Sequence, residues 1–290
     1  MSFLKTVEQI RQLGREILPA IPGSGAIYAA QHEREPYQSV RVTRDVRYGP
    51  HERHRLDVFE GEDGLSGKPV FIFVHGGGFV GGDKRQPGSP YNDNVALWAV
   101  RHGMVGINIT YRLAPEATYP AGSEDLAAAV AWARARAAEL GGDPERIFVL
   151  GTSAGAVHVA NFVAHAQFEA SRAGVAGVIL LSGVYDLTTA QDDMSKVYFG
   201  EDVSRYAQMS SLPGLLESPI PILFVLTEFD PRPFEQQALQ VVQAWFARHG
   251  QWPDFIRLMG HNHLTSTLHM NTEDDYLGRQ ILAFMERGRA

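Results

Sequence analysis

The hydrophobic positions of the chain fall into short runs separated by segments with helical spacing. Apolar residues recur every three or four positions in 124–140, in 234–249 and from residue 276 onward, which indicates amphipathic helices. Strand-like runs that alternate with such helices are typical of a mostly parallel sheet with helices on both faces. The runs are 40–48, 54–60, 70–75, 104–111, 146–151, 175–183, 221–227 and 254–260. We therefore predict an α/β fold with an eight-stranded, mostly parallel sheet in a single domain, residues 1–290.

The first two predicted strands differ from the others. Residues 40–48 and 54–60 alternate polar and apolar positions and are separated only by GPHER. This pattern predicts an antiparallel hairpin at the sheet edge with one face in water. The middle strands are continuously apolar, as expected of strands that are covered on both sides.

Two segments do not follow this alternation. Residues 185–219 have no strong period and are longer than an ordinary connection. They form either a surface excursion or a lid over a site, and we favour the lid because long insertions usually carry a function. Residues 3–18 have apolar positions at helical spacing interleaved with charges, which predicts an amphipathic helix and not a signal peptide. We predict a small cap made of residues 1–38 and 185–219.

Composition narrows the functional classes. The formal net charge is -7 with acidic and basic residues interspersed, so there is no basic stripe for nucleic acid. The chain has no cysteine, which excludes disulfides, thiolate metal sites and a cysteine nucleophile. No segment has the roughly 18 uncharged apolar residues of a membrane span. We predict a cytoplasmic protein that acts on a small molecule and binds neither nucleic acid nor membrane.

The sequence Gly-Thr-Ser-Ala-Gly, residues 151–155, lies directly between a buried strand and a helix. Gly-x-Ser-x-Gly also occurs by chance in loops, but a serine at so sharp a turn is raised above the sheet edge. Gly151 and Gly155 remove the side chains that would collide there. The helix that follows directs its free amides and positive dipole end to the same point, where an oxyanion is favoured. We predict Ser153 as a nucleophile.

Another buried strand ends in His-Gly-Gly-Gly-Phe, residues 75–79. A glycine run can be a flexible turn or a phosphate cradle, but no Gly-Lys-Ser/Thr follows and the spacing is not that of a dinucleotide site. Consecutive glycines let successive backbone N–H groups point into one cavity. His75 is expected to hold the loop by hydrogen bonding, and Phe79 is expected either in an acyl pocket or in the core. The predicted oxyanion-hole donors are the N–H groups of Gly77, Gly78 and Ala154.

Four motifs follow one another along the chain: HGGGF, YRLAPEATYPAGSEDLAAAVAW, GTSAG and LTEFDP. In this order they resemble the α/β-hydrolase superfamily. More narrowly, they resemble the hormone-sensitive-lipase-like carboxylesterases and the neighbouring bacterial feruloyl-esterase and kynurenine-formamidase-like group. The resemblance extends from about Leu56 to the C-terminus. Two positions depart from the lipase-like pattern, since Thr152 stands where an acidic residue is usual and DPRPFEQQ replaces Asp-Pro-Leu-Arg-Asp.

The fold implied by this resemblance carries its catalytic residues in the order serine, acid, histidine. Asp230 comes just after a buried strand, at the same sheet edge as Ser153, and Pro231 prevents the strand from continuing. We predict Asp230 as the acid. Its neighbour Glu228 is expected to be exposed or structural, and Asp186 is the alternative acid because some hydrolases draw the acid from that position.

Three histidines follow the last predicted strand, at positions 261, 263 and 269. The resemblance places the base three residues after a glycine and before a large apolar residue, and Gly260, His263 and Leu264 match this pattern. We predict His263 as the base, with His261 as the alternative and His269 as structural. His-x-His followed by His269 can also hold a divalent metal. Because a serine mechanism already accounts for the loop, we predict no metal and no cofactor.

Several other side chains have structural interpretations. His158 is expected to pack inside the domain, and Arg112 and Glu116 are expected to order the turn after a core strand. Asp125 is expected in the first turn of its helix, where a negative charge suits the helix dipole. Four aromatic residues either line the pocket or anchor the cap: Tyr185, Tyr198, Phe199 and Tyr206. Of these, Tyr185 joins Phe79 as a predicted substrate contact.

Together these predictions describe a serine carboxylesterase that hydrolyses short-chain or aromatic esters through an acyl-enzyme. The same residues suit cleavage of a related amide, as in an arylformamidase, which is the alternative enzyme. A non-catalytic interaction module on the same fold is a third hypothesis. Such modules typically lose a member of the triad, whereas this sequence has a candidate for each.

Overall fold

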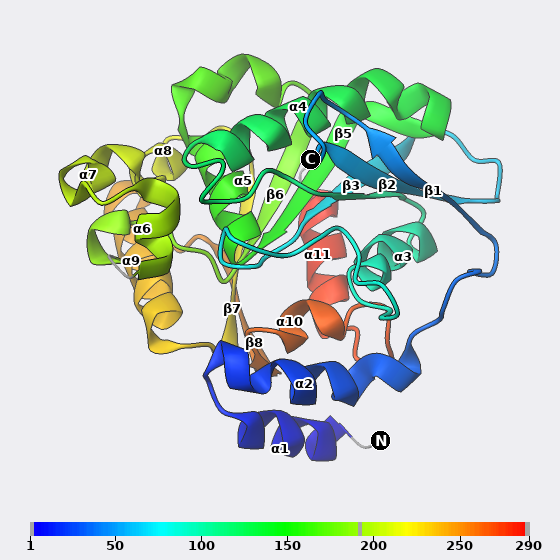
Figure 1. The fold of residues 1–290 in the computed structure, drawn as a ribbon, viewed down its shortest axis with the longest axis horizontal. Coiled ribbons are helices and arrows are strands. Elements are labelled where there is room, and N and C mark those ends of the chain that lie inside the picture. Colours follow the sequence, from blue (N-terminus) through cyan, green and yellow to red (C-terminus); the bar gives the residue numbers. More distant parts are fainter. Residues whose placement is uncertain (1–2, 191–192, 288–290) are drawn as a thin grey trace.

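A computed structural model describes residues 3–190 and 193–287. Its centre is an eight-stranded sheet with the strand order β1-β2-β4-β3-β5-β6-β7-β8 (Figure 1). β2 is antiparallel to both of its neighbours, and all other neighbouring strands are parallel. The predicted α/β fold and its eight strands are confirmed. The strands are β1 Val40–Arg47, β2 Arg55–Gly61, β3 Lys68–Val74, β4 Val105–Ile109, β5 Gly142–Thr152, β6 Val175–Leu181, β7 Ile222–Phe229 and β8 Asp254–Asn262.

Helices cover both faces of this sheet (Figure 1). The helices are α1 Phe3–Leu13, α2 Ile17–Tyr28, α3 Asp93–Arg101, α4 Ala121–Arg136, α5 Ala154–Ala164, α6 Asp193–Phe199, α7 Tyr206–Met209, α8 Leu212–Leu216, α9 Arg232–His249, α10 Thr265–Leu268 and α11 Tyr276–Arg287. In β3, Val70, Ile72 and Val74 pack with residues of α4 and α5, whereas Phe71 and Phe73 pack with residues of α3 and α11. Alternate residues of a strand point to opposite faces, so a continuously apolar strand contributes to two cores.

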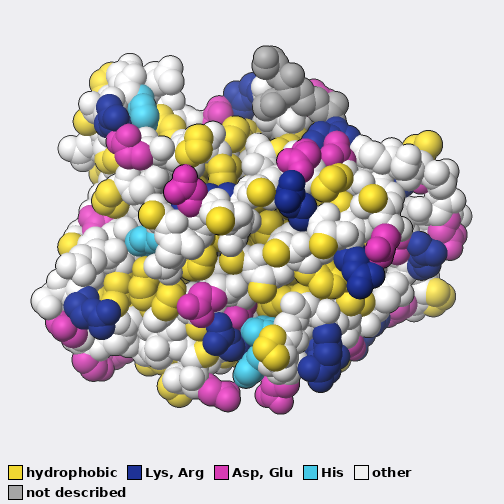
Figure 2. Space-filling model, turned by 90° about the horizontal axis from the view of Figure 1, so that it is seen from above, with side chains coloured by type: hydrophobic (Ala, Val, Ile, Leu, Met, Phe, Trp, Pro, Cys, Tyr) yellow, Lys and Arg dark blue, Asp and Glu magenta, His cyan; other side chains and the backbone are white. Residues whose placement is uncertain are grey.

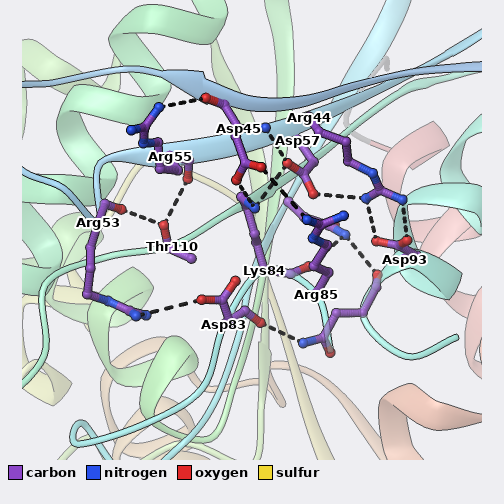
Figure 3. Close-up of polar contacts among 12 residues, drawn as sticks. Arg44, Asp45, Arg53, Arg55, Asp57, Asp83, Lys84, Arg85, Asp93 and Thr110 are labelled. Atoms are coloured by element: carbon purple, nitrogen blue, oxygen red, sulfur yellow. Dashed lines mark hydrogen bonds and ion pairs between the residues drawn. The ribbon is translucent and has the colours of Figure 1, made fainter. Parts of the chain in front are cut away.

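The edge hairpin of β1 and β2 departs from the prediction in one strand. β1 alternates between buried and more exposed positions as predicted, but the middle of β2 is buried throughout, so the wet face expected for β2 is wrong. Asp57 of β2 is fully buried. Arg44 and Lys84 pair with its carboxylate at 2.9 and 3.1 Å and so compensate its charge (Figure 3). Arg44 also lies 2.6 Å from Asp93 at the start of α3. Buried charges must be paired, and these pairs join the hairpin to the loop that carries Lys84.

The N-terminal segment forms two helices and not the single helix predicted over 3–18. Gly14 follows α1 with a φ of 76° and donates its N–H to the carbonyl oxygen of Arg11, as residues just beyond a helix end often do. α2 then begins at Ile17 and contains Pro22, which usually interrupts a helix. The proline explains why the pattern alone did not indicate α2. In the fold, α1 packs on β8 and α2 packs on α10 (Figure 1).

The long segment 185–219 contains the short helices α6, α7 and α8. Tyr198, Phe199 and Tyr206 are buried in one cluster with Phe79. The rings of Phe79 and Tyr198 stack with their centroids 4.6 Å apart. Of the two roles expected for these three aromatic residues, the structure therefore favours anchoring the segment to the domain.

The surface carries mixed charge. On the face drawn in Figure 2, Lys and Arg side chains are interspersed with Asp and Glu and form no continuous basic stripe. Within residues 3–190 and 193–287, no helix is long and apolar enough to cross a membrane.

Candidate active site

Ser153 occupies a strained turn between β5 and α5. Its φ is 53° and its ψ is -121°, a conformation that non-glycine residues rarely adopt. The turn is tight because neighbouring backbones approach closely on both sides. A Cβ on Gly151 would lie 2.5 Å from the oxygen of Gly155, and a Cβ on Gly155 would collide with the carbonyl of Val74. The two glycines therefore permit the turn that exposes Ser153, as their positions in the sequence predict.

His263 and Asp230 form a hydrogen-bonded pair. His263 Nδ1 lies 2.7 Å from Asp230 Oδ1, and both side chains are almost completely buried. The other carboxylate oxygen of Asp230 accepts hydrogen bonds from Ser182 Oγ and from the backbone N–H of Thr227, both at 2.6 Å. Burial alone would raise the pKa of Asp230, but these hydrogen bonds, with that of His263 the strongest, hold the pKa below its usual range. The carboxylate is therefore ionised and fixed in orientation.

The second ring nitrogen of His263 is not used by the pair with Asp230. His263 and Ser153 line one cavity of about 660 Å³. Among the described residues, His263 Nε2 has no hydrogen-bond partner. Each residue of this group follows a parallel strand: Ser153 follows β5, Asp230 follows β7 and His263 follows β8. All three therefore lie at the carboxyl edge of the sheet. Ligand sites in open α/β sheets form at this edge.

The glycine loop after β3 lines the same cavity. Gly77 and Gly78 have φ values of 125° and 59°, which lie in the region that favours glycine. Within the described part of the chain, the N–H groups of Gly77 and Gly78 donate to no protein acceptor. Ala154 is the first residue of α5, and the first N–H groups of a helix have no partner inside the helix. The backbone N–H groups of these three residues are therefore not used by the secondary structure.

His75 lies at the base of the glycine loop and packs against Tyr111, with ring centroids 4.4 Å apart. Its Nδ1 lies 2.6 Å from the carbonyl oxygen of Gly76, which agrees with the predicted loop-holding role. Burial lowers the pKa of His75 to about 3, so its ring is neutral near pH 7. His158 is also fully buried and packs among Phe79 and Tyr111, as expected.

The structure separates the three C-terminal histidines. His261 Nε2 lies 3.1 Å from Asp274 Oδ2, and the rings of His261 and His269 are 4.1 Å apart, whereas His263 faces Asp230. The metal-binding alternative that combined all three histidines is therefore wrong in its ligand set. Burial and the neighbouring His261 lower the pKa of His269 to about 3.

The alternative acids have other partners. Glu228 Oε2 accepts the backbone N–H of Gly260 at 2.7 Å, and Asp186 Oδ1 accepts the N–H of Thr188 at 3.0 Å. Glu228 of β7 thus bonds the backbone of the neighbouring strand β8, a structural role that is one of the two expected for it, and Asp186 bonds the backbone of its own turn.

The YRLAPE segment contains one correction. Arg112 forms the expected structural ion pair, 2.7 Å from Asp125, and Glu116 is exposed. Asp125, however, is not in the first turn of α4, because the helix begins at Ala121 and Glu124 is its first-turn acid. Asp125 is buried, and His54 Nε2 lies 3.0 Å from the same carboxylate oxygen, Oδ1. Its role is to pair with these neighbours and not to interact with the helix dipole.

The two predicted substrate contacts have different outcomes. Phe79 lines the cavity and also packs in the aromatic cluster, so it combines the two roles that its sequence position left open. Tyr185 does not line this cavity. Its side chain packs in the main core against Phe224, with ring centroids 5.6 Å apart. The preceding residue, Val184, lines the cavity instead, because successive residues of an extended segment point in opposite directions.

One wall of the cavity is a helix that the sequence pattern did not predict. Ile17, Leu18 and Ile21 of α2 line the cavity, and Leu18 and Ile21 remain 76% and 49% exposed. The α2 sequence is an apolar run with two prolines and two glycines, a composition typical of a loop, and it packs on α10. Met194 and Ser195 of α6 also line the cavity, so both segments predicted to form a cap reach it.

The sheet is mostly parallel and carries a serine turn at the end of a central strand. A histidine–aspartate pair follows its last two strands. This is the architecture of an α/β hydrolase. A family model described as "alpha/beta hydrolase fold" matches residues 71–242. This match covers more than half of the chain, which therefore belongs to that family.

Curated relatives include esterase LipQ of Mycobacterium tuberculosis, which is 33% identical over 237 residues, covering 77% of this chain and 52% of LipQ. Carboxylesterase NlhH of the same species is 48% identical over 88 residues, covering 30% of this chain and 26% of NlhH. The chain thus matches about half, or less, of the length of these relatives.

Solved structures with this fold include esterase B from Lactobacillus rhamnosis in an inhibited form. It has a TM-score of 0.73 and 17% identity, covering 100% of this chain and 97% of that one. A truncated carbohydrate esterase from gut microbiota has a TM-score of 0.71 and 17% identity, covering 90% and 100%. At this level of identity the likeness concerns the fold alone.

Proposed function

We propose that the protein is a serine-dependent carboxylic ester hydrolase. The observation that carries the proposal is the His263–Asp230 pair, because His263 lines the same cavity as Ser153 and its Nε2 has no hydrogen-bond partner among the described residues. The names of the relatives LipQ and NlhH, both esterases, support the same reaction. The strained backbone of Ser153 further supports a role for this serine, because such strain persists mainly at functional sites.

In this mechanism Ser153 Oγ attacks the ester carbonyl carbon while His263 Nε2 takes the hydroxyl proton. Asp230 holds the other ring nitrogen and stabilises the imidazolium as it forms. When the tetrahedral intermediate collapses, the bond to the leaving alcohol breaks and His263 returns the proton to that alcohol. Water then attacks the acyl-enzyme by the same route, which releases the acid and restores the serine.

The oxyanion of each tetrahedral intermediate would be bound by the N–H groups of Gly77, Gly78 and Ala154. Two considerations support this assignment. The two glycine N–H groups lack protein acceptors within the described residues, and Ala154 begins a helix whose positive dipole end faces the same point. Fixed donors of this kind typically contribute about 10²–10³-fold each to kcat.

The substrate is proposed to be a short-chain or aromatic ester under a small cap formed by 1–38 and 185–219. A volume of about 660 Å³ lies within the usual range for small-molecule pockets. Most of the cavity wall is apolar, with Phe79 on one side and α2 on another. An apolar acyl or aryl group would be stabilised there by the burial of its surface.

Ser153→Ala tests the proposal directly. We expect kcat/KM for p-nitrophenyl butyrate to fall by about 10⁴-fold or more, because the nucleophile is lost while the fold is kept. A fluorophosphonate probe should label the wild type and not the variant. Ser204→Ala, which changes an exposed serine, is the matched control and should keep both activity and labelling. Full activity of Ser153→Ala, or no labelling of the wild type, would refute the proposal.

A further inference from the structure

A second group of ionisable side chains lies beside the segment that carries His263. His261 and His269 are 1% and 0% exposed, and the partly buried Asp274 adjoins both. One ligand atom from each residue, an imidazole nitrogen or a carboxylate oxygen, lies within 4.8 Å of the other two. None of these three residues has a role in the proposed ester hydrolysis.

His269 has an unused nitrogen in this group. Its Nδ1 lies 2.7 Å from the backbone oxygen of Thr265, and because a carbonyl only accepts hydrogen bonds, Nδ1 carries the proton of the neutral ring. Nε2 therefore bears a free electron pair. It is buried and has no hydrogen-bond partner among the described residues. A buried acceptor without a donor costs free energy, and a ligand that takes this electron pair would remove the cost.

Thr265 also supports the second imidazole. Its Oγ1 lies 3.3 Å from His261 Nδ1, and it can accept that N–H while donating its own proton to the Asn262 oxygen, also 3.3 Å away. Histidines that bind metals usually donate their other ring N–H to an oxygen in this way, which directs the remaining nitrogen at the ion. The Tyr28 hydroxyl, 3.3 Å from Asp274 Oδ2, orients the carboxylate.

We propose that His261, His269 and Asp274 bind a divalent cation of the Zn²⁺ class. Two imidazole nitrogens and a carboxylate oxygen are ligands that Zn²⁺ takes at about 2.0–2.2 Å, with water in the remaining tetrahedral position. Ligand atoms in such a site lie roughly 3.4 Å apart. His261 Nε2 and Asp274 Oδ2 are already 3.1 Å apart, and the ligand atom of His269 lies within 4.8 Å of the ligand atoms of both, so binding requires the side chains to close by no more than about 1.4 Å.

The bound ion would act on the structure and not on the reaction. It would join the end of β8 to the segment before α11, and through Tyr28 it would hold α2, which forms one wall of the cavity. His263 turns to Asp230 and stays outside this coordination sphere.

The test uses the full chain without a histidine tag, stripped with a chelator and then dialysed against Zn²⁺. We expect about one equivalent of Zn²⁺ per chain by elemental analysis, and Co²⁺ should give the visible absorption of a tetrahedral site. At a Zn²⁺ concentration roughly a hundred times Kd, the melting temperature should rise by about 5 °C. His269→Gln should lose the Zn²⁺ uptake and the rise in melting temperature.

Two further variants distinguish this site from others. Asp274→Asn keeps the size of the side chain and should weaken Zn²⁺ uptake even if His269→Gln folds poorly. His263→Gln is the matched control and should bind Zn²⁺ as the wild type does. The proposal is overturned if the wild type takes up no Zn²⁺, if His269→Gln and Asp274→Asn bind as much as the wild type, or if His263→Gln alone abolishes binding.

Discussion

His261 and His263 lie two residues apart, and each contacts an aspartate, yet the two pairs have different surroundings. The His263–Asp230 pair leaves His263 Nε2 without a partner among the described residues, and His263 lines a cavity with Ser153. The His261–Asp274 pair is enclosed by His269 and Tyr28, with ring centroids 4.1 and 6.4 Å from that of His261. The difference shows that a histidine–carboxylate contact does not by itself define a catalytic pair.

What distinguishes the two pairs is whether the second ring nitrogen has a protein partner. A general base must reach the proton it removes, either directly or through one water, so it needs a nitrogen that is not already engaged. His263 Nε2 has no hydrogen-bond partner among the described residues, whereas His261 uses both nitrogens on protein groups, Thr265 and Asp274.

Replacing His261 and His263 separately with alanine tests the difference between the two pairs most directly. His263→Ala should lower kcat/KM for a short-chain ester by about 10⁴-fold, because it removes the proposed base. His261→Ala should change kcat/KM only a few-fold but lower the free energy of unfolding by about 1–3 kcal/mol, because a buried carboxylate loses its partner. Steady-state kinetics and urea unfolding on both variants provide the measurement. The contrast fails if His261→Ala loses as much activity as His263→Ala.

The glycine loop opposite His263 offers the next largest effect. Gly77→Ala should lower kcat/KM by about 10²-fold, because a Cβ at a φ of 125° would collide with the carbonyl of Gly81 and displace an oxyanion donor. Gly250→Ala is the control, since Gly250 also has a positive φ but nothing lies within 4 Å of the added atom. It should cost some stability and leave kinetics unchanged. Equal kinetics for the two variants would argue against the proposed oxyanion hole.

Another buried imidazole, that of His158, contacts no carboxylate among residues 3–190 and 193–287 and is not among the residues that line the cavity, so its effect should be on stability alone. Burial lowers its pKa to about 3 in the folded state, against about 6.5 when unfolded. Between these values the unfolded chain binds more protons, so the free energy of unfolding falls as the pH decreases, by up to about 1.4 kcal/mol per pH unit. His158→Phe should reduce this slope in urea titrations from pH 6 to about pH 4. An unchanged slope would exclude a buried, neutral His158.

Some residues of the candidate site can be predicted from the sequence, and others cannot. Ser153 and Asp230 were chosen because each directly follows a buried apolar run, and a strand end is a local feature of the chain. Parallel strands bring their carboxyl ends to one edge, so local positions are sufficient to group these residues. The sequence predicts a cap of two segments, 1–38 and 185–219, but not that α2 within the first segment is a helix, because Pro22 and the nearby glycines obscure the helical pattern.

Local patterns in the sequence predict the eight-stranded α/β sheet, the glycines of the serine turn and the strand ends that carry the candidate triad. These features depend on periodicity and backbone sterics, which act between near neighbours. Long-range packing, in contrast, places Tyr185 in the core, buries Asp57 between two cations, and turns His261 and His263 to different aspartates. Each of these depends on residues far away in the chain, and no local pattern contains that information.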